Sequence, residues 1–181
     1  MRKELLLFQS YVKEEKTEEA FLTGRNMVAR KPGSRKGVEA YLAYLMQLSK
    51  REENLTDRMR YLAEAKTVLT GYERNARLNP AVVERIMNLR KEMADIDESQ
   101  KSEFLLKLEQ KNDASLDKLE QLEKQLEEVT RREEMKPVLS GIQDVLGTIE
   151  KKCLTEEQRC RYEALNEALE AQVARKVECF G

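Results

Sequence analysis

The longest segment free of helix-breaking residues lies between Pro80 and Pro137, where neither glycine nor proline occurs. These two residues interrupt helices more strongly than any others. Elsewhere apolar residues recur at steps of three and four, and no run alternates apolar with polar residues as a strand would. The sequence therefore predicts an all-α protein, built from antiparallel helical hairpins followed by a longer helical hairpin or bundle with coiled-coil character.

Residues 1–98 are expected to form one domain, a layer of helical hairpins. Its first helix covers residues 3–15. Thr17 and Ser34 have the side-chain oxygens that N-caps use, and we expect them to start the second and third helices. The fourth helix is predicted over residues 55–76, where apolar residues again recur at helical spacing.

A fifth helix is expected to begin with Asn79 as its N-cap and Pro80 as its first residue, because proline is favoured at that position. The polar stretch 97–103 then breaks the register of the apolar stripe. This stretch is either a turn or a phase shift within one long helix. The stripe that precedes it consists of Val82, Ile86, Leu89, Met93 and Ile96.

Beyond this stretch the apolar residues follow a heptad pattern. Two arrangements are open: a seam between two copies of the chain, or packing on the chain's own last two helices. In a homodimer, a polar Asn112 at a core position would fix a parallel register. The seam would consist of Leu105, Leu108, Asn112, Leu119, Leu122, Leu126 and Val129.

Residues 99–181 are assigned to a second domain, although both assigned domains could form one continuous domain. Pro137 is expected to open a further helix. The last helix should start at Thr155, which stands three residues before Gln158, the spacing of a capping box.

The first 80 residues resemble tetratricopeptide helix pairs, a repeat of about 34 residues with a proline near its end. The residues at the signature positions are Leu7, Tyr11, Ala20 and Pro32, and a second copy would close with Tyr72 and Pro80. The chain departs from the pattern in three ways. Phe8 stands where a small residue is usual, Gly24 stands where an aromatic is usual, and the prolines are 48 residues apart. The resemblance implies a concave surface for a peptide or partner protein rather than catalysis.

The complete absence of histidine removes most catalytic arrangements. It excludes Ser-His-Asp and Cys-His pairs and every histidine-containing zinc site. The three cysteines are too few for a four-cysteine zinc site, and no phosphate-binding glycine loop is present. We therefore expect no enzyme activity, cofactor or metal, with a carboxylate-metal enzyme as the least favoured alternative.

Charge is divided between the two halves of the chain. Residues 1–91 contain 19 Lys and Arg against 12 Asp and Glu, and the remainder contains 14 against 22. A basic cluster surrounds Pro32 and is either a binding site for an acidic partner or a solvated turn. The basic half also suggests nucleic-acid association as the alternative function. The cluster consists of Arg25, Arg30, Lys31, Arg35 and Lys36.

These observations favour an adaptor or scaffold protein that binds a partner protein or peptide on a helical surface. The binding groove is expected on the first four helices, with the basic turn at its edge. No apolar run approaches the roughly 20 residues that span a bilayer, so membrane insertion is not expected. An odd number of cysteines is typical of reduced thiols, which favours the cytoplasm.

Overall fold

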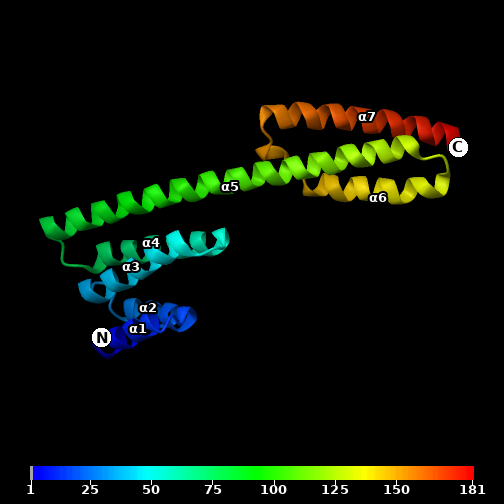
Figure 1. Ribbon diagram of the computed structural model, residues 1–181. Coiled ribbons are helices and arrows are strands. Elements are labelled where there is room, and N and C mark those ends of the chain that lie inside the picture. Colours follow the sequence, from blue (N-terminus) through cyan, green and yellow to red (C-terminus); the bar gives the residue numbers. More distant parts are fainter. Residues whose placement is uncertain (1) are drawn as a thin grey trace. The chain divides into compact units, whose positions relative to one another are not determined.

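A computed structural model of the chain describes residues 2–181 and confirms the all-α prediction: these residues form α-helices, one 3₁₀ turn and no strand. Figure 1 shows the order of the elements. They are α1 (Arg2–Lys13), α2 (Thr17–Arg30), α3 (Arg35–Arg51), α4 (Leu55–Asn75), α5 (Pro80–Glu128), α6 (Arg132–Thr148), the turn Lys151–Cys153 and α7 (Glu156–Phe180).

The chain divides into two compact units, the first ending at Ser102 and the second covering Glu103–Gly181. The division falls inside α5, as does the predicted boundary after residue 98. The polar stretch 97–103 is helical throughout, so it is the phase shift and not the turn.

The first unit contains two helical hairpins and the beginning of α5. Helices α1 and α2 pack together, α3 packs on α2, and α3 pairs with α4 (Figure 1). Connections of three or four residues make each pair antiparallel. An ion pair between Arg30 and Glu4 joins the end of α2 to the start of α1, as this direction requires.

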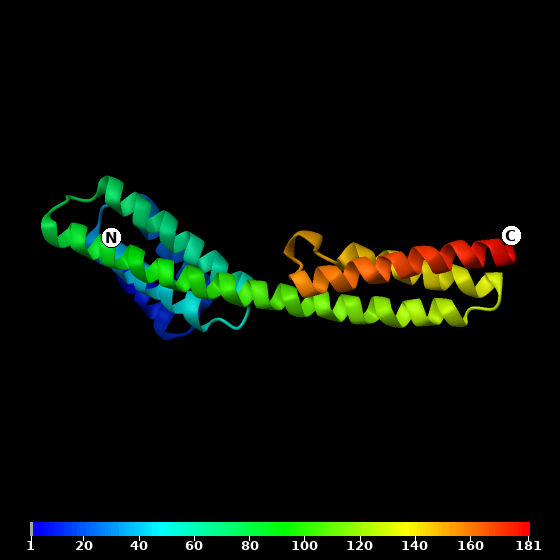
Figure 2. The same ribbon diagram turned by 90° about the horizontal axis from the view of Figure 1, so that it is seen from above.

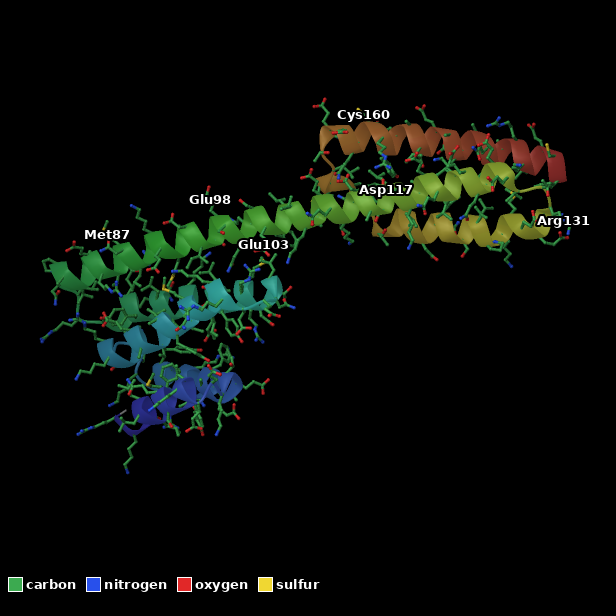
Figure 3. The ribbon with its side chains drawn as sticks, viewed as in Figure 1. Met87, Glu98, Glu103, Asp117, Arg131 and Cys160 are labelled. Atoms are coloured by element: carbon green, nitrogen blue, oxygen red, sulfur yellow. The ribbon has the colours of Figure 1, made fainter. Side chains whose placement is uncertain are left out.

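The predicted stripe of α5 is confirmed as its buried face in the first unit. Its five residues are each less than 9% exposed and join the core formed by α1–α4. Gln100, four residues after Ile96, is also buried and continues this face. Its Nε2 donates to the backbone oxygen of Ser49 at 3.0 Å. The opposite side of α5 faces solvent, as Met87 and Glu98 show in Figure 3.

The second unit is a three-helix bundle of the remainder of α5, α6 and α7, which lie side by side in both views (Figures 1 and 2). Helix α6 runs antiparallel to α5: Ser115 pairs with Thr148 at 3.0 Å, and Asn112 Oδ1 accepts from the backbone N–H of Glu150 at 3.1 Å. Helix α7 returns parallel to α5.

The heptad residues mostly pack within one chain, which is the second of the two predicted arrangements. Asn112, Leu119, Leu126 and Val129 are at most 5% exposed and face α6 and α7. Leu122 and Leu108 are half-buried, and Leu105 is 58% exposed. The buried part of the heptad face is thus occupied without a second copy, and Leu116, outside the predicted seam, is buried with it.

Three of the predicted helix starts are confirmed in part or in full. Asn79 Oδ1 accepts from the N–H of Val82 at 3.0 Å, as an N-cap does. Thr155 and Gln158 form the predicted capping box. Ser34 occupies the N-cap position of α3, but its side chain makes no capping hydrogen bond.

Two other predicted starts are wrong. Thr17 is the first residue inside α2, and Lys16 precedes it as the N-cap residue without a side-chain bond. Helix α6 begins at Arg132, so Pro137 lies inside the helix instead of opening it. Glu133 and Glu134 favour this earlier start through the positive helix terminus, and the buried side chain of Met135 anchors the added turn.

Candidate binding groove

Helices α1, α3 and α5 share one face of the first unit, and two adjoining hollows lie along it. The α1/α3 hollow has a volume of about 320 Å³ and the α3/α5 hollow about 380 Å³. Ala43 and Gln47 line both hollows, so the two join across α3. Together they form what we term the α1/α3/α5 groove.

The groove exists because α3 presents small residues between its buried stripe and solvent. Ala40 and Ala43, one helical turn apart, each carry only a methyl group, and both line the α1/α3 hollow. Buried Phe8 and half-buried Val12 and Tyr44 supply the apolar part of this hollow. The α1/α3 hollow is therefore suited to an apolar side chain.

Aromatic packing fixes the floor of the α1/α3 hollow. The rings of Phe8 and Tyr44 meet edge to face with centroids 5.5 Å apart, and Phe8 makes a similar contact with Tyr41 at 5.9 Å. Burial raises the pKa of Tyr44 above its ordinary value. A tyrosine hydroxyl is protonated at neutral pH even at its ordinary pKa of about 10, so this hydroxyl remains a hydrogen-bond donor there.

The α3/α5 hollow is charged at its rim. Among the described residues that line it, the cations are Lys50, Arg51 and Arg85, and the carboxylates are Glu39 and Glu92. Glu92 pairs with Lys50 at 2.9 Å and Glu39 with Arg85 at 3.9 Å, both across the hollow. Three cations against two carboxylates leave one positive charge uncompensated.

Two of the groove's cations make no ion pair within residues 2–181. Arg51 ends α3, and Lys13 ends α1 beside the α1/α3 hollow. Each stands in the last turn of its helix, where the negative end of the helix dipole favours a cation. A negatively charged ligand group at this end of the groove would find both side chains available.

A further hollow of about 390 Å³ continues past the end of α3 and shares Lys50 and Glu92 with the groove. Gln100 and Ser49, whose hydrogen bond ties α5 to α3, lie at this end.

The structure does not gather the predicted basic cluster into one patch. Arg30 pairs with Glu4, Arg25 with Glu64 at 3.6 Å, and Arg35 with Glu39 at 3.5 Å. Each arginine is therefore held at a different carboxylate. Lys31 and Lys36 are exposed and make no ion pair in the described part of the chain.

Only Arg35 of the predicted cluster reaches the groove, and it does so through Glu39. The cations that do line the groove are Lys13, Lys50, Arg51 and Arg85, and sequence reasoning missed all four as site residues. The missed signal was Ala40 and Ala43 beside the apolar stripe of α3, since small residues there mark a hollow. Helix α5, not only the first four helices, also supplies a wall.

No group of three or more Asp, Glu and Cys side chains within residues 2–181 is arranged to hold a metal ion. Cys153, Cys160 and Cys179 are exposed free thiols. No helix in this described range combines the length and the apolar character that crossing a bilayer requires.

Comparisons of the chain with models of protein families, with curated proteins and with solved structures gave no significant match.

Proposed function

We propose that this chain is a non-enzymatic adaptor or scaffold protein that binds a segment of a partner protein in the α1/α3/α5 groove. The observation that carries the proposal is the continuity of the two hollows across Ala43 and Gln47. Continuity matters because a peptide needs a surface several residues long, which neither hollow supplies alone. An apolar floor between polar rims is the usual make-up of such surfaces.

The proposal includes a tetratricopeptide-like packing of the first two hairpins. Of the residues that resemble the repeat, Ala20 is fully buried and Tyr72 is 4% exposed at the close of the second pair, which supports this packing, whereas Leu7 is 47% exposed. In this arrangement helices α1, α3 and α5 line the binding surface. We place the protein in the cytoplasm, and the three unpaired cysteines support a reducing compartment.

Blocking the groove tests the function. Ala43→Trp adds a large side chain at an exposed position where the hollows join, so it should abolish partner binding and leave the fold intact. Ala94→Trp is the matched control, because Ala94 is exposed on α5 and lines neither hollow. Full-length protein and both variants would be immobilised in extract of the native host, and retained proteins identified and then titrated in purified form.

The proposal expects a purified partner that binds wild type and Ala94→Trp equally and Ala43→Trp at least tenfold more weakly. A partner insensitive to Ala43→Trp would place binding elsewhere. Titrations at rising salt separate the nucleic-acid alternative, because phosphate contacts lose affinity steeply with salt. Engagement of Arg25, Arg30 and Arg35 with carboxylates weakens that alternative.

A further inference from the structure

The two hollows differ in chemistry, and the difference points to the kind of segment the groove accepts. The α1/α3 hollow offers Phe8, Val12 and Tyr44 to an apolar side chain, and Lys13, at the end of α1, is the one charged residue among its described lining. The α3/α5 hollow offers an uncompensated positive charge, with Arg51 unpaired in the described residues. A ligand that fills both must carry an apolar side chain and a carboxylate, at a set spacing along its chain.

The separation of the hollows limits the spacing of those two ligand groups. The hollows lie on either side of α3, and packed helices are about 8–10 Å apart. A polyproline II segment rises about 3.1 Å per residue with three residues per turn. Side chains three residues apart in such a segment therefore point the same way and are separated by about 9 Å.

Gln47 supports an extended ligand, since it lines both hollows and makes no hydrogen bond within residues 2–181. Its amide can donate and accept at once. The backbone of a polyproline II segment has no internal hydrogen bonds, so its amide groups are free to pair with this side chain. In a helical ligand the backbone N–H and C=O groups are already hydrogen-bonded within the helix, so they would not pair with Gln47.

We propose that the groove recognises an extended segment in which an apolar residue and an Asp or Glu stand three residues apart. The apolar side chain enters the α1/α3 hollow, and the carboxylate pairs with Arg51 and with the unused donors of Lys50. This inference rests on the proposed function, because it specifies the ligand of the same groove. Charge complementarity carries it: one incoming carboxylate neutralises the hollow's excess charge.

The probe is a library of random decapeptides displayed on phage and panned against the full-length chain. Enrichment of peptides with an apolar residue three positions before or after Asp or Glu, lost with Ala43→Trp and retained with Ala94→Trp, supports the inference. Enriched peptides that lack this spacing or the acidic residue, yet still depend on Ala43, would overturn the inference and leave the groove function standing. If no enrichment depends on Ala43, both proposals fail.

A charge variant then tests the carboxylate contact directly. Arg51→Gln should weaken binding of a selected, fluorescently labelled peptide about tenfold, the usual effect of losing a charged hydrogen bond. The same variant should bind the Asp-to-Asn or Glu-to-Gln form of the peptide as wild type does. Lys36→Gln, which removes an exposed cation outside the groove, is the matched control. Equal affinity of wild type and Arg51→Gln for the acidic peptide would overturn the assigned contact.

Discussion

Gly24 in α2 lies directly against the ring of Tyr41 in α3, which fills the space that any side chain at Gly24 would need. A Cβ on Gly24 would overlap Cδ2 of Tyr41 and lie 3.1 Å from Cε2 of Phe8. Both rings are buried in the core, Tyr41 at 0% and Phe8 at 2% exposure. The absence of a side chain at Gly24 therefore lets α2 approach both neighbouring helices.

Gly24→Ala should destabilise the first unit. Alanine normally stabilises a helix relative to glycine, but here the added methyl group must displace two packed rings. We expect a net loss of about 1–3 kcal/mol, the usual range for overpacking a core. Urea unfolding followed by circular dichroism would measure it.

Gly71→Ala is the control for this prediction. Gly71 also lies inside a helix, α4, but apart from its chain neighbours and the nearby backbone of that helix, no atom lies within 4 Å of where its Cβ would be. The substitution should therefore stabilise the protein by about 0.5–1 kcal/mol through helix propensity alone. If both variants were stabilised equally, the close contact between Gly24 and Tyr41 would be wrong.

Phe8 and Gly24 also explain what sequence reasoning could and could not predict. Each departs from the tetratricopeptide pattern, with a large residue where a small one is usual and the reverse. The structure shows that they meet, so the two departures compensate for each other in size. A residue pattern read along the chain has no information about which distant positions will touch.

Local features were the predictable part of the fold. Helix periodicity identified the buried face of α5, and capping chemistry identified Asn79 and Thr155, because these signals act within a few residues. The continuity of α5 through residues 97–103 was left open, since it depends on which partner each part of the helix packs against. The groove depends on three helices at once, which is why its cations were missed.

Asn54 provides a prediction about helix capping that the sequence pattern did not yield. Its side-chain oxygen accepts from the N–H groups of Thr56 at 2.8 Å and Asp57 at 3.3 Å. Asn54→Ala should cost about 1 kcal/mol of unfolding free energy. Ser34→Ala is the comparison and should cost less than about 0.5 kcal/mol, because Ser34 makes no capping bond. Equal losses in urea titrations would count against the cap at Asn54.

Tyr41 should make the first unit sensitive to alkaline pH. Burial, followed by the nearby carboxylate of Glu64, raises the pKa of its hydroxyl well above the ordinary value of about 10. The folded state therefore holds this proton more tightly than the unfolded state. The resulting stability is complete below about pH 10 and is lost as the pH rises towards the folded-state pKa.

Tyr41→Phe keeps the ring contacts and removes the titrating proton. At pH 7 its unfolding free energy should lie within about 1 kcal/mol of wild type, because the hydroxyl's bond to Glu64 is long, at 3.5 Å. Between pH 9 and about 11 it should lose stability less steeply than wild type. Tyr162→Phe, in the second unit, should leave the alkaline unfolding of the first unit unchanged. Parallel pH profiles for wild type and Tyr41→Phe would contradict the prediction.

The side chain of Gln158 should contribute more to the stability of the second unit than the capping hydrogen bond that was predicted from the sequence. Its Nε2 donates to the backbone oxygen of Glu109 at 2.9 Å and to Oδ1 of Asp113 at 2.7 Å. Thr155→Ala removes one capping bond and should cost about 1 kcal/mol. Gln158→Ala leaves three groups without their partner and should cost about 2–3 kcal/mol. Hydrogen exchange in α7 would rank the two variants, and a larger effect of Thr155→Ala would be unexpected.

Gln158→Glu distinguishes the donor role of this side chain from its size. The glutamate has nearly the same shape and can still accept from the N–H of Thr155, but at neutral pH it donates to neither Glu109 nor Asp113. It also places a second carboxylate at hydrogen-bond distance from Asp113.

The repulsion raises the pKa of the carboxylate pair, so protonation at acidic pH restores a donor and relieves the like charges. The loss of unfolding free energy in Gln158→Glu, relative to wild type, should therefore be largest near pH 7 and smaller towards pH 4. The corresponding loss in Gln158→Ala should change little over the same pH range. A pH-independent deficit for Gln158→Glu, measured by urea unfolding, would show that the contact with Asp113 does not form.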